Sequence, residues 1–188
     1  MSEIEERLSW DEYFMSVAKL VAMRSDDPNT KVGAVIVKDK MIIATGYNGK
    51  PKGMDNIPWG KSEDPMQSKF TYVVHSEQNA ISSVCRIGHS TEGATIYVTR
   101  HPCNECAKAI VQSGIKEVVY DNVKHEERFD VQASKIMFES AGILTRRFIP
   151  SREIILPSDL ENEYNPGYIN PMMKPKTRVR IPDNKNKD

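Results

Sequence analysis

Two short clusters of residues carry the side chains of this sequence that are best suited to chemistry. The first is His75 with Glu77, and the second is Cys103 with Cys106, directly after Pro102. Imidazole and thiolate groups bind zinc, and a zinc ion with three protein ligands keeps a fourth position for catalysis. We therefore predict that His75, Cys103 and Cys106 hold one zinc ion and that Glu77 is the catalytic residue.

The spacing within each cluster indicates how these side chains must be placed. Cys103 and Cys106 are three positions apart at the predicted start of a helix, so both sulfurs point to one side. The positive end of the helix dipole lowers the pKa of a thiol there and favours the thiolate. His75 and Glu77 are two positions apart, which on a regular helix separates them by about 200°. Both can serve one site only if His75 lies at a helix entrance and Glu77 lies in the first turn, facing inward.

Other interpretations of these residues remain open. A Cys-x-x-Cys pair can be a redox pair, although such a pair does not require the His-x-Glu cluster. A structural zinc site normally has four protein ligands. The fourth would have to come from Cys85, His89, His101 or His125. Cys85 is better explained as a small core residue among apolar neighbours. The combination of His-x-Glu with Pro-Cys-x-x-Cys instead matches the signature of zinc-dependent deaminases.

The composition favours an intracellular protein that acts on a small molecule. Lys plus Arg and Asp plus Glu number 26 each among the 188 residues, so no net positive charge attracts a nucleic acid polymer. No apolar run approaches the ~20 residues that span a membrane, and no secretory signal segment is recognised. We expect a cytoplasmic protein, or one of the host-cell cytoplasm if its source is a virus, without membrane partners.

The elements that must position the two clusters are predicted from periodicity over residues 1–156. A capping box and helical spacing of apolar residues indicate a helix over 10–24. A β-hairpin is expected over 32–44, and a long irregular segment then runs to about residue 69. Further helices are expected at 75–87, from Pro102 at the first position to about 114, and from about 131 to 142. Further strands are expected at 95–99, 116–120 and 144–149.

This order of elements predicts the fold class. Alternating strands and helices are typical of a sheet with parallel strand pairs and helices on both faces, an α/β protein with three α/β/α layers. Residues 157–188 hold five of the eleven prolines and show no apolar periodicity. They are predicted to be a Pro-rich, flexible C-terminal tail outside the deaminase-like domain.

The sequence resembles the deoxycytidylate deaminases of the cytidine deaminase superfamily from about residue 8 to residue 150. The segments that carry the resemblance are Ser9 to Met15, Arg24-Ser25, Gly46 to Gly49, Pro58-Trp59, His75 to Ala80, Pro102 to Lys108 and Gly114 to Lys116. The family has Ala where this chain has Ser76, which is expected to point away from the zinc. The resemblance implies a cytidine-deaminase-like fold with a mixed five-stranded sheet. It also implies hydrolysis of dCMP to dUMP and ammonia, a reaction that feeds thymidylate synthesis.

The resemblance also implies roles for further residues. Asn48 would hydrogen-bond the deoxyribose hydroxyl, and Glu77 would carry protons. Arg24 and Ser25 would lie near the 5′-phosphate, and Tyr120 would contact the substrate. Gly46, Tyr47 and Gly49 would belong to a second nucleotide site, where dCTP activates and dTTP inhibits. The family typically forms a homo-hexamer, and one catalytic Zn²⁺ per chain is implied as the cofactor.

Two alternatives to this function stay open. One is a bifunctional deaminase that also takes dCTP as a substrate. The other, from a different class, is a zinc-stabilised binding module without catalysis, which would have no need of Glu77. Free-nucleoside deaminases usually have Cys at the position of His75, and enzymes of tRNA or single-stranded DNA require a cationic channel. Both observations favour a free nucleotide as the substrate.

Overall fold

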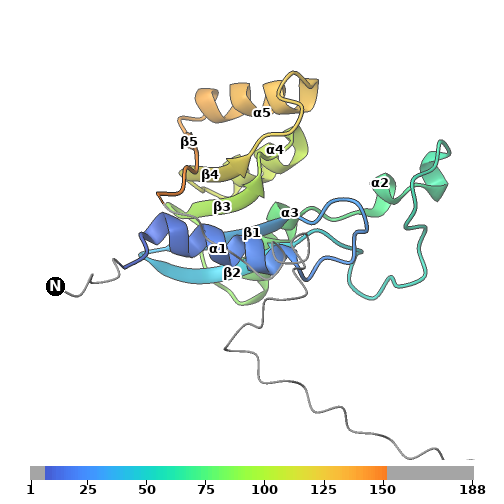
Figure 1. Cartoon of the computed structure of the whole chain (residues 1–188), viewed down its shortest axis with the longest axis horizontal. Coiled ribbons are helices and arrows are strands. Elements are labelled where there is room, and N and C mark those ends of the chain that lie inside the picture. The colour runs from blue at the N-terminus through green and yellow to red at the C-terminus, as the bar shows by residue number, and fades with distance from the viewer. Residues whose placement is uncertain (1–6, 152–188) are drawn as a thin grey trace, which may run out of the picture. The chain divides into compact units, whose positions relative to one another are not determined.

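The computed structural model of the chain describes residues 7–151. The predicted boundary at residue 156 and the predicted tail over 157–188 lie outside the described residues. The elements are α1 (Trp10–Ala22), β1 (Gly33–Lys38), β2 (Met41–Tyr47), the 3-10 helix η1 (Pro65–Gln67), α2 (Lys69–Tyr72), α3 (Ser76–Arg86), β3 (Thr95–Arg100), α4 (Asn104–Gln112), β4 (Glu117–Asn122), α5 (Phe129–Ser140) and β5 (Leu144–Arg147). Figure 1 shows their arrangement. In the described part of the chain, no helix is long and apolar enough to span a membrane.

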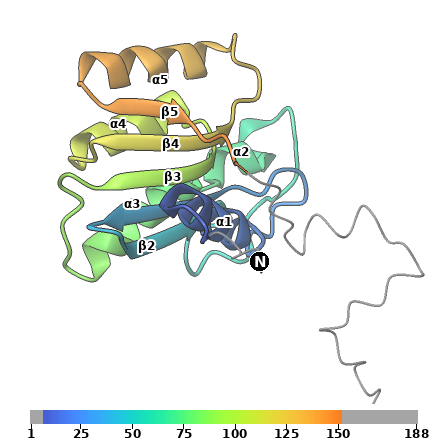
Figure 2. The ribbon, with the colours of Figure 1, turned by 60° about the vertical axis from the view of Figure 1, so that its left-hand side comes forward.

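The five strands form one mixed sheet in the order β2-β1-β3-β4-β5 (Figure 2). Strand β1 runs antiparallel to both β2 and β3, whereas β3, β4 and β5 run parallel to one another. The prediction of a mixed five-stranded sheet is therefore confirmed. The parallel strands place the carboxyl ends of β3 and β4 at the same edge, and ligands of α/β sheets bind at such edges.

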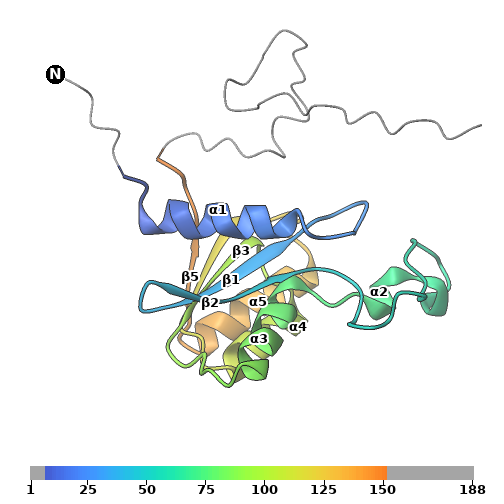
Figure 3. The ribbon, with the colours of Figure 1, turned by 90° about the horizontal axis from the view of Figure 1, so that it is seen from below.

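Helices cover both faces of the sheet, as predicted (Figure 3). Helix α1 is the only helix among residues 7–151 on one face, where Phe14 and Met15 pack with Val35 and Tyr97 of the strands. Helices α3, α4 and α5 cover the other face. Successive strand residues point to opposite faces, so Ala34 and Ile36 of β1 join this second core. The core side chains of the three helices on this face are Ala80, Val84, Ala107, Ile110 and Phe138.

The start of α1 shows why that helix begins where it does. The hydroxyl of Ser9 accepts a hydrogen bond from the backbone of Glu12, and the Glu12 carboxylate accepts one from the backbone of Ser9. This predicted capping box is confirmed, and it satisfies two backbone donors that the helix leaves unpaired. Arg146 on β5 forms an ion pair with Asp11 at 2.6 Å, which ties the start of α1 to the sheet edge.

Gly46 on β2 brings the sheet into direct contact with α3. A Cβ atom at this position would lie 2.2 Å from the carbonyl oxygen of Ser76 and 2.4 Å from the amide nitrogen of Ala80. The family resemblance assigned this glycine to a second nucleotide site. The first turn of α3, which carries Glu77, therefore lies directly against this glycine.

Candidate active site

His75 and Glu77 are placed by the start of α3. His75 is the N-cap residue, with extended backbone angles of −73° and 156°, and the helix begins at Ser76. Glu77 therefore lies in the first turn, and its side chain is buried. The two side chains line one pocket because His75 lies just before the regular helix, the placement that the spacing predicts.

Cys103 and Cys106 are placed in the same way by the start of α4. Cys103 is the N-cap residue, with backbone angles of −75° and 173°, and the helix begins at Asn104. The prediction that Pro102 occupies the first helical position is therefore wrong. Pro102 belongs to the short connection after β3, where the extended backbone of Cys103 turns its sulfur toward the first turn of α4. Cys106 lies in that first turn and is fully buried.

The three predicted ligands lie together, although they come from two different helices. The Nδ1 atom of His75 is 3.5 Å from the sulfur of Cys103 and 3.3 Å from the sulfur of Cys106. Tetrahedral zinc with bonds of ~2.1 Å to nitrogen and ~2.3 Å to sulfur separates such ligand atoms by about 3.6 Å. The residues thus fit zinc, and among residues 7–151 no fourth His, Cys, Asp or Glu joins the group. Cys85 is not a ligand, and it is exposed, so its interpretation as a core residue is wrong.

The three predicted ligands shift the pKa values of one another. The Cys106 thiol and His75 donate hydrogen bonds to Cys103, which lowers the pKa of Cys103 to about 4. The pKa of Cys106 is raised because it donates to Cys103 and is buried. The hydrogen bond to Cys103 also raises the pKa of His75. The cluster therefore favours a thiolate on Cys103, and a dication would stabilise the thiolates further.

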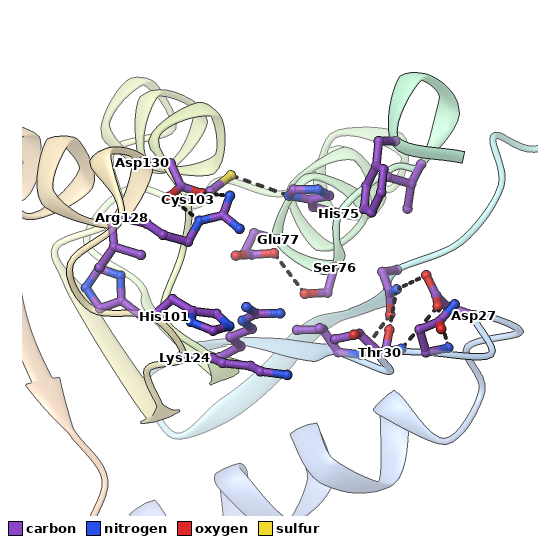
Figure 4. A pocket seen from close by; sticks show the side chains of 18 of the residues that line it. Asp27, Thr30, His75, Ser76, Glu77, His101, Cys103, Lys124, Arg128 and Asp130 are labelled. Atoms are coloured by element: carbon purple, nitrogen blue, oxygen red, sulfur yellow. Dashed lines mark hydrogen bonds and ion pairs between the residues drawn. The ribbon is translucent and has the colours of Figure 1, made fainter. Parts of the chain in front are cut away.

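Glu77 lies beside this cluster but is not part of the ligand group (Figure 4). Burial raises the pKa of its carboxyl group. The hydroxyl of Ser76 donates a hydrogen bond of 2.8 Å to its Oε2 atom. Ser76 therefore contacts Glu77 and lines the pocket, and its expected orientation away from the zinc stays a prediction. A buried carboxyl group with a raised pKa is suited to accept a proton and release it again.

A pocket of about 350 Å³ opens next to these residues, within the range typical of small-molecule sites. Its lining includes His75, Glu77 and Cys103 on the helix side. Thr30 and Asn48 also line it. The remaining lining residues with charged or ionisable side chains are Asp27, Lys61, Lys69, Arg100, His101, Lys124, His125, Arg128 and Asp130. Cationic groups outnumber acidic ones, which suits an anionic ligand.

The four predicted substrate contacts are distributed unevenly around this pocket. Asn48 lines it, whereas Arg24, Ser25 and Tyr120 do not. Arg24 is exposed at the end of α1. Ser25 is buried, and its hydroxyl donates to the backbone oxygen of Asn48 at 2.7 Å. Tyr120 packs edge-on against the ring of His101, with centroids 4.7 Å apart.

The three residues assigned to a second nucleotide site lie at the end of β2. The backbone oxygen of Tyr47 accepts a hydrogen bond of 2.7 Å from Asn79 on α3. Gly49 pairs through its backbone with Val74, just before His75. Together with the packing of Gly46 on α3, these hydrogen bonds place residues 46–49 in direct contact with the helix that carries Glu77. The location is compatible with coupling to the site, and the nucleotide role stays a prediction.

The sequence analysis missed several residues of the pocket. His101 was weighed only as a fourth metal ligand, yet it lines the pocket and is 6% exposed. Its Nδ1 atom is 2.9 Å from the backbone oxygen of Pro102, and its Nε2 atom is buried without a hydrogen-bond partner. Lys124 and Arg128 follow β4, beyond the segments that carry the family resemblance. No periodic pattern marks such residues, because they belong to connections between elements.

A three-layer α/β/α domain with His, Cys and Cys at two helix starts and a buried Glu beside them is the architecture of the zinc-dependent deaminases. Residues 8–122 match the family model described as the cytidine and deoxycytidylate deaminase zinc-binding region. The chain belongs to this family, and His75, Cys103 and Cys106 are positioned to bind its zinc ion.

Individual relatives agree with this assignment. Deoxycytidylate deaminase of Homo sapiens is 41% identical over 172 residues, which cover 86% of this chain and 96% of the human protein. A probable deoxycytidylate deaminase of Drosophila melanogaster is 43% identical over 160 residues, covering 80% of this chain and 78% of the fly protein. Among solved structures, dCMP deaminase from the cyanophage S-TIM5 in complex with dCMP and dUMP superposes with a TM-score of 0.63. It is 28% identical and covers 73% of this chain and 95% of the phage protein.

Proposed function

We propose that this protein hydrolyses dCMP to dUMP and ammonia. The main support for the proposal is the buried Glu77 carboxyl group. It lies beside the three predicted zinc ligands, in a pocket of about 350 Å³. The similarity to deoxycytidylate deaminases, and to a phage enzyme solved with dCMP and dUMP, supports the choice of substrate. The product would feed thymidylate synthesis, and we infer a cytoplasmic location for this reaction.

The chemistry requires a nucleophile and a group that moves protons. When bound, zinc lowers the pKa of a coordinated water toward ~7 and so supplies the nucleophile. Glu77 is proposed to accept a proton on its carboxylate and to pass it to the ring nitrogen next to the reacting carbon. After the hydroxyl group has added to the reacting carbon, the same carboxylate takes its remaining proton and gives it to the leaving amine, and the C–N bond breaks to release ammonia. The raised pKa of Glu77 and its hydrogen bond from Ser76 support this assignment.

The evidence for the proposed substrate contacts differs from residue to residue. Asn48 is proposed to accept a hydrogen bond from a deoxyribose hydroxyl, and its place in the pocket lining supports this. Arg24 and Ser25 are proposed near the phosphate on the family resemblance. Tyr120 is proposed to act indirectly, because it packs against His101, which lines the pocket.

A substrate panel tests the proposed function. We expect ammonia release from dCMP with a kcat/KM at least about 10-fold above that for dCTP, cytidine or deoxyadenylate, since a tenfold preference needs only ~1.4 kcal/mol of differential binding. Initial rates are measured on zinc-loaded protein. Equal turnover of dCTP would indicate a bifunctional deaminase. A zinc-loaded protein that releases no ammonia from any of them would indicate a binding module.

We also propose that the protein is a homo-hexamer regulated by dCTP as activator and dTTP as inhibitor. The proposed effector site involves Gly46, Tyr47 and Gly49, and the contacts of this segment with α3 support coupling to Glu77. Typical coupling free energies are ~1–3 kcal/mol, which corresponds to changes of about 5- to 150-fold in affinity. Initial rates against dCMP concentration should be sigmoidal, become hyperbolic with dCTP and fall with dTTP. Hyperbolic rates that neither triphosphate changes would contradict the proposal.

A further inference from the structure

Asp27 and Lys69 form a buried ion pair that the metal site does not use. The Nζ atom of Lys69 lies 2.6 Å from Oδ1 and 2.5 Å from Oδ2 of Asp27, and both side chains are 4% exposed. Every other ion pair within residues 7–151 has at least one side chain that is more than a third exposed. A buried ion pair is weak evidence for stability because desolvation opposes the attraction, so another role has to be considered.

The pair joins two segments that are far apart in the sequence. Asp27 lies in the connection between α1 and β1, where its Oδ1 atom accepts hydrogen bonds from the backbones of Asn29 and Thr30 at 2.8 and 3.1 Å. Lys69 begins α2 in the long segment after β2, and its backbone donates to Gly60 at 2.8 Å. Asp27 and Lys69 both line the pocket, so their ion pair joins the two segments of the chain at its wall.

Asn48 is held by the same connection. Its Nδ2 atom donates to the backbone oxygen of Thr30 at 2.8 Å and to Asp27 at 3.4 Å. Its Oδ1 atom accepts a hydrogen bond of 2.7 Å from the backbone of Val32. Both N–H donors of the carboxamide are therefore used, and an amide oxygen has room for one more bond. Since Asn48 lines the pocket, a hydroxyl group of the ligand can donate a hydrogen bond to this oxygen.

The ion pair also determines the charge of this side of the pocket. Burial raises the pKa of Asp27, but the hydrogen bonds from Lys69, Asn29 and Thr30 lower it more, so the carboxylate is ionised. Without Lys69, this carboxylate would repel an anionic nucleotide. With Lys69, the ion pair carries no net charge, and the second lone pair of Asn48 Oδ1 remains to accept a hydrogen bond from a ligand. Figure 4 shows Asp27 and Thr30 together at one side of the pocket, with Arg128 at the other.

We propose that Asp27 and Lys69 are positioning residues for the sugar of the nucleotide. Their ion pair holds the connection around Thr30, and this connection orients Asn48 so that its remaining acceptor meets a sugar hydroxyl. The inference rests on the proposed deamination of dCMP. It predicts that loss of the ion pair weakens the binding only of nucleotides that carry the sugar hydroxyl.

The test uses the double variant Asp27→Asn/Lys69→Met, which removes both charges and leaves neither one buried alone. We expect the KM for dCMP to rise about 5- to 10-fold, the order expected when one hydrogen bond is lost. The KM for 2′,3′-dideoxycytidine monophosphate, which lacks the 3′-hydroxyl, should change less than about 2-fold in the same variant, because that bond is absent from the start. Zinc content and kcat for dCMP should stay close to those of the unmodified protein. Asp121→Asn/Lys19→Met, which removes an ion pair between α1 and β4, is the matched control.

The outcomes separate positioning from a purely structural role. An equal rise in KM for both substrates, or unchanged KM values with only a lower free energy of unfolding, would overturn the inference. If the double variant does not fold, Lys69→Arg retains the charge but changes its geometry, and the same difference between substrates is expected on a smaller scale. Dissociation constants for dUMP and 2′,3′-dideoxyuridine monophosphate, measured by calorimetry, test the positioning without turnover. A wild-type protein that binds dUMP but does not deaminate dCMP would contradict the proposed function alone.

Discussion

Replacing Glu77 by Gln is expected to reduce kcat for dCMP by at least about 10²–10⁴-fold, the contribution typical of general acid–base catalysis. Two proton transfers are assigned to this one carboxyl group, so the loss should lie at the upper end of that range. Gln retains the shape of the side chain and can still accept a hydrogen bond from Ser76, but it cannot carry a proton at neutral pH. The variant should therefore fold and bind dCMP.

The measurement combines single-turnover rates with zinc analysis of the same preparation. We expect zinc in the Glu77→Gln variant to match the unmodified protein, because Glu77 does not belong to the ligand group. Glu105→Gln is a suitable control, since Glu105 lies on α4 close to the ligands in sequence but is exposed and paired with Lys108. A Glu77→Gln protein that loses its zinc would show that Glu77 is a ligand and that the proposed roles are wrong.

Replacing Cys106 by Ala is expected to remove the metal and the activity together. Zinc should fall from about one ion per chain to near zero, because the two remaining protein ligands are too few for a stable tetrahedral site. The activity should fall by more than the roughly 10- to 100-fold that follows when a residue supporting a metal ligand is replaced. Elemental analysis and ammonia release from one protein sample measure both effects.

Cys85→Ala is the matched control for this experiment. Cys85 is exposed on α3 and does not belong to the ligand group, so its replacement should leave zinc and rate unchanged. Removing zinc from the unmodified protein with a chelator should abolish turnover, and adding Zn²⁺ should restore it. Because zinc binds only the folded site, chelation should also lower the melting temperature. Full activity in a metal-free sample would contradict the mechanism.

Several features of the site were predictable from the sequence because they depend on the chain within one helical turn. The two-residue spacing of His75 and Glu77 is compatible with one site only at a helix entrance, and His75 is the N-cap of α3. The same local rule places Cys103 before α4 and Cys106 in its first turn. Strand and helix periodicity likewise predicted the three layers, whereas the mixed five-stranded sheet was implied by the family resemblance. Such patterns reflect backbone geometry, which neighbouring residues determine.

Other features depended on which surfaces the folded chain covers. Periodicity assigns residues to a face of an element, but it does not state how far burial extends at the end of that element. Cys85 therefore looked like a core residue but is exposed near the end of α3, and the contact between Ser76 and Glu77 was not predicted. For the same reason, the close packing of Gly46 against the backbone of α3 was not predicted.

Only the tertiary structure revealed the residues that complete the pocket. Asp27 and Lys69 are 42 positions apart; Asp27 lies in a connection and Lys69 begins the short helix α2, and no periodic pattern marks either segment. His101 and Arg128 likewise follow strands β3 and β4 and meet at the pocket because parallel strands end at one edge of the sheet. The free energy of such long-range contacts depends on burial and on exact distances between side chains. Both come from the packing of the whole domain, so spacing along the chain determined the metal ligands while tertiary packing decided the walls around them.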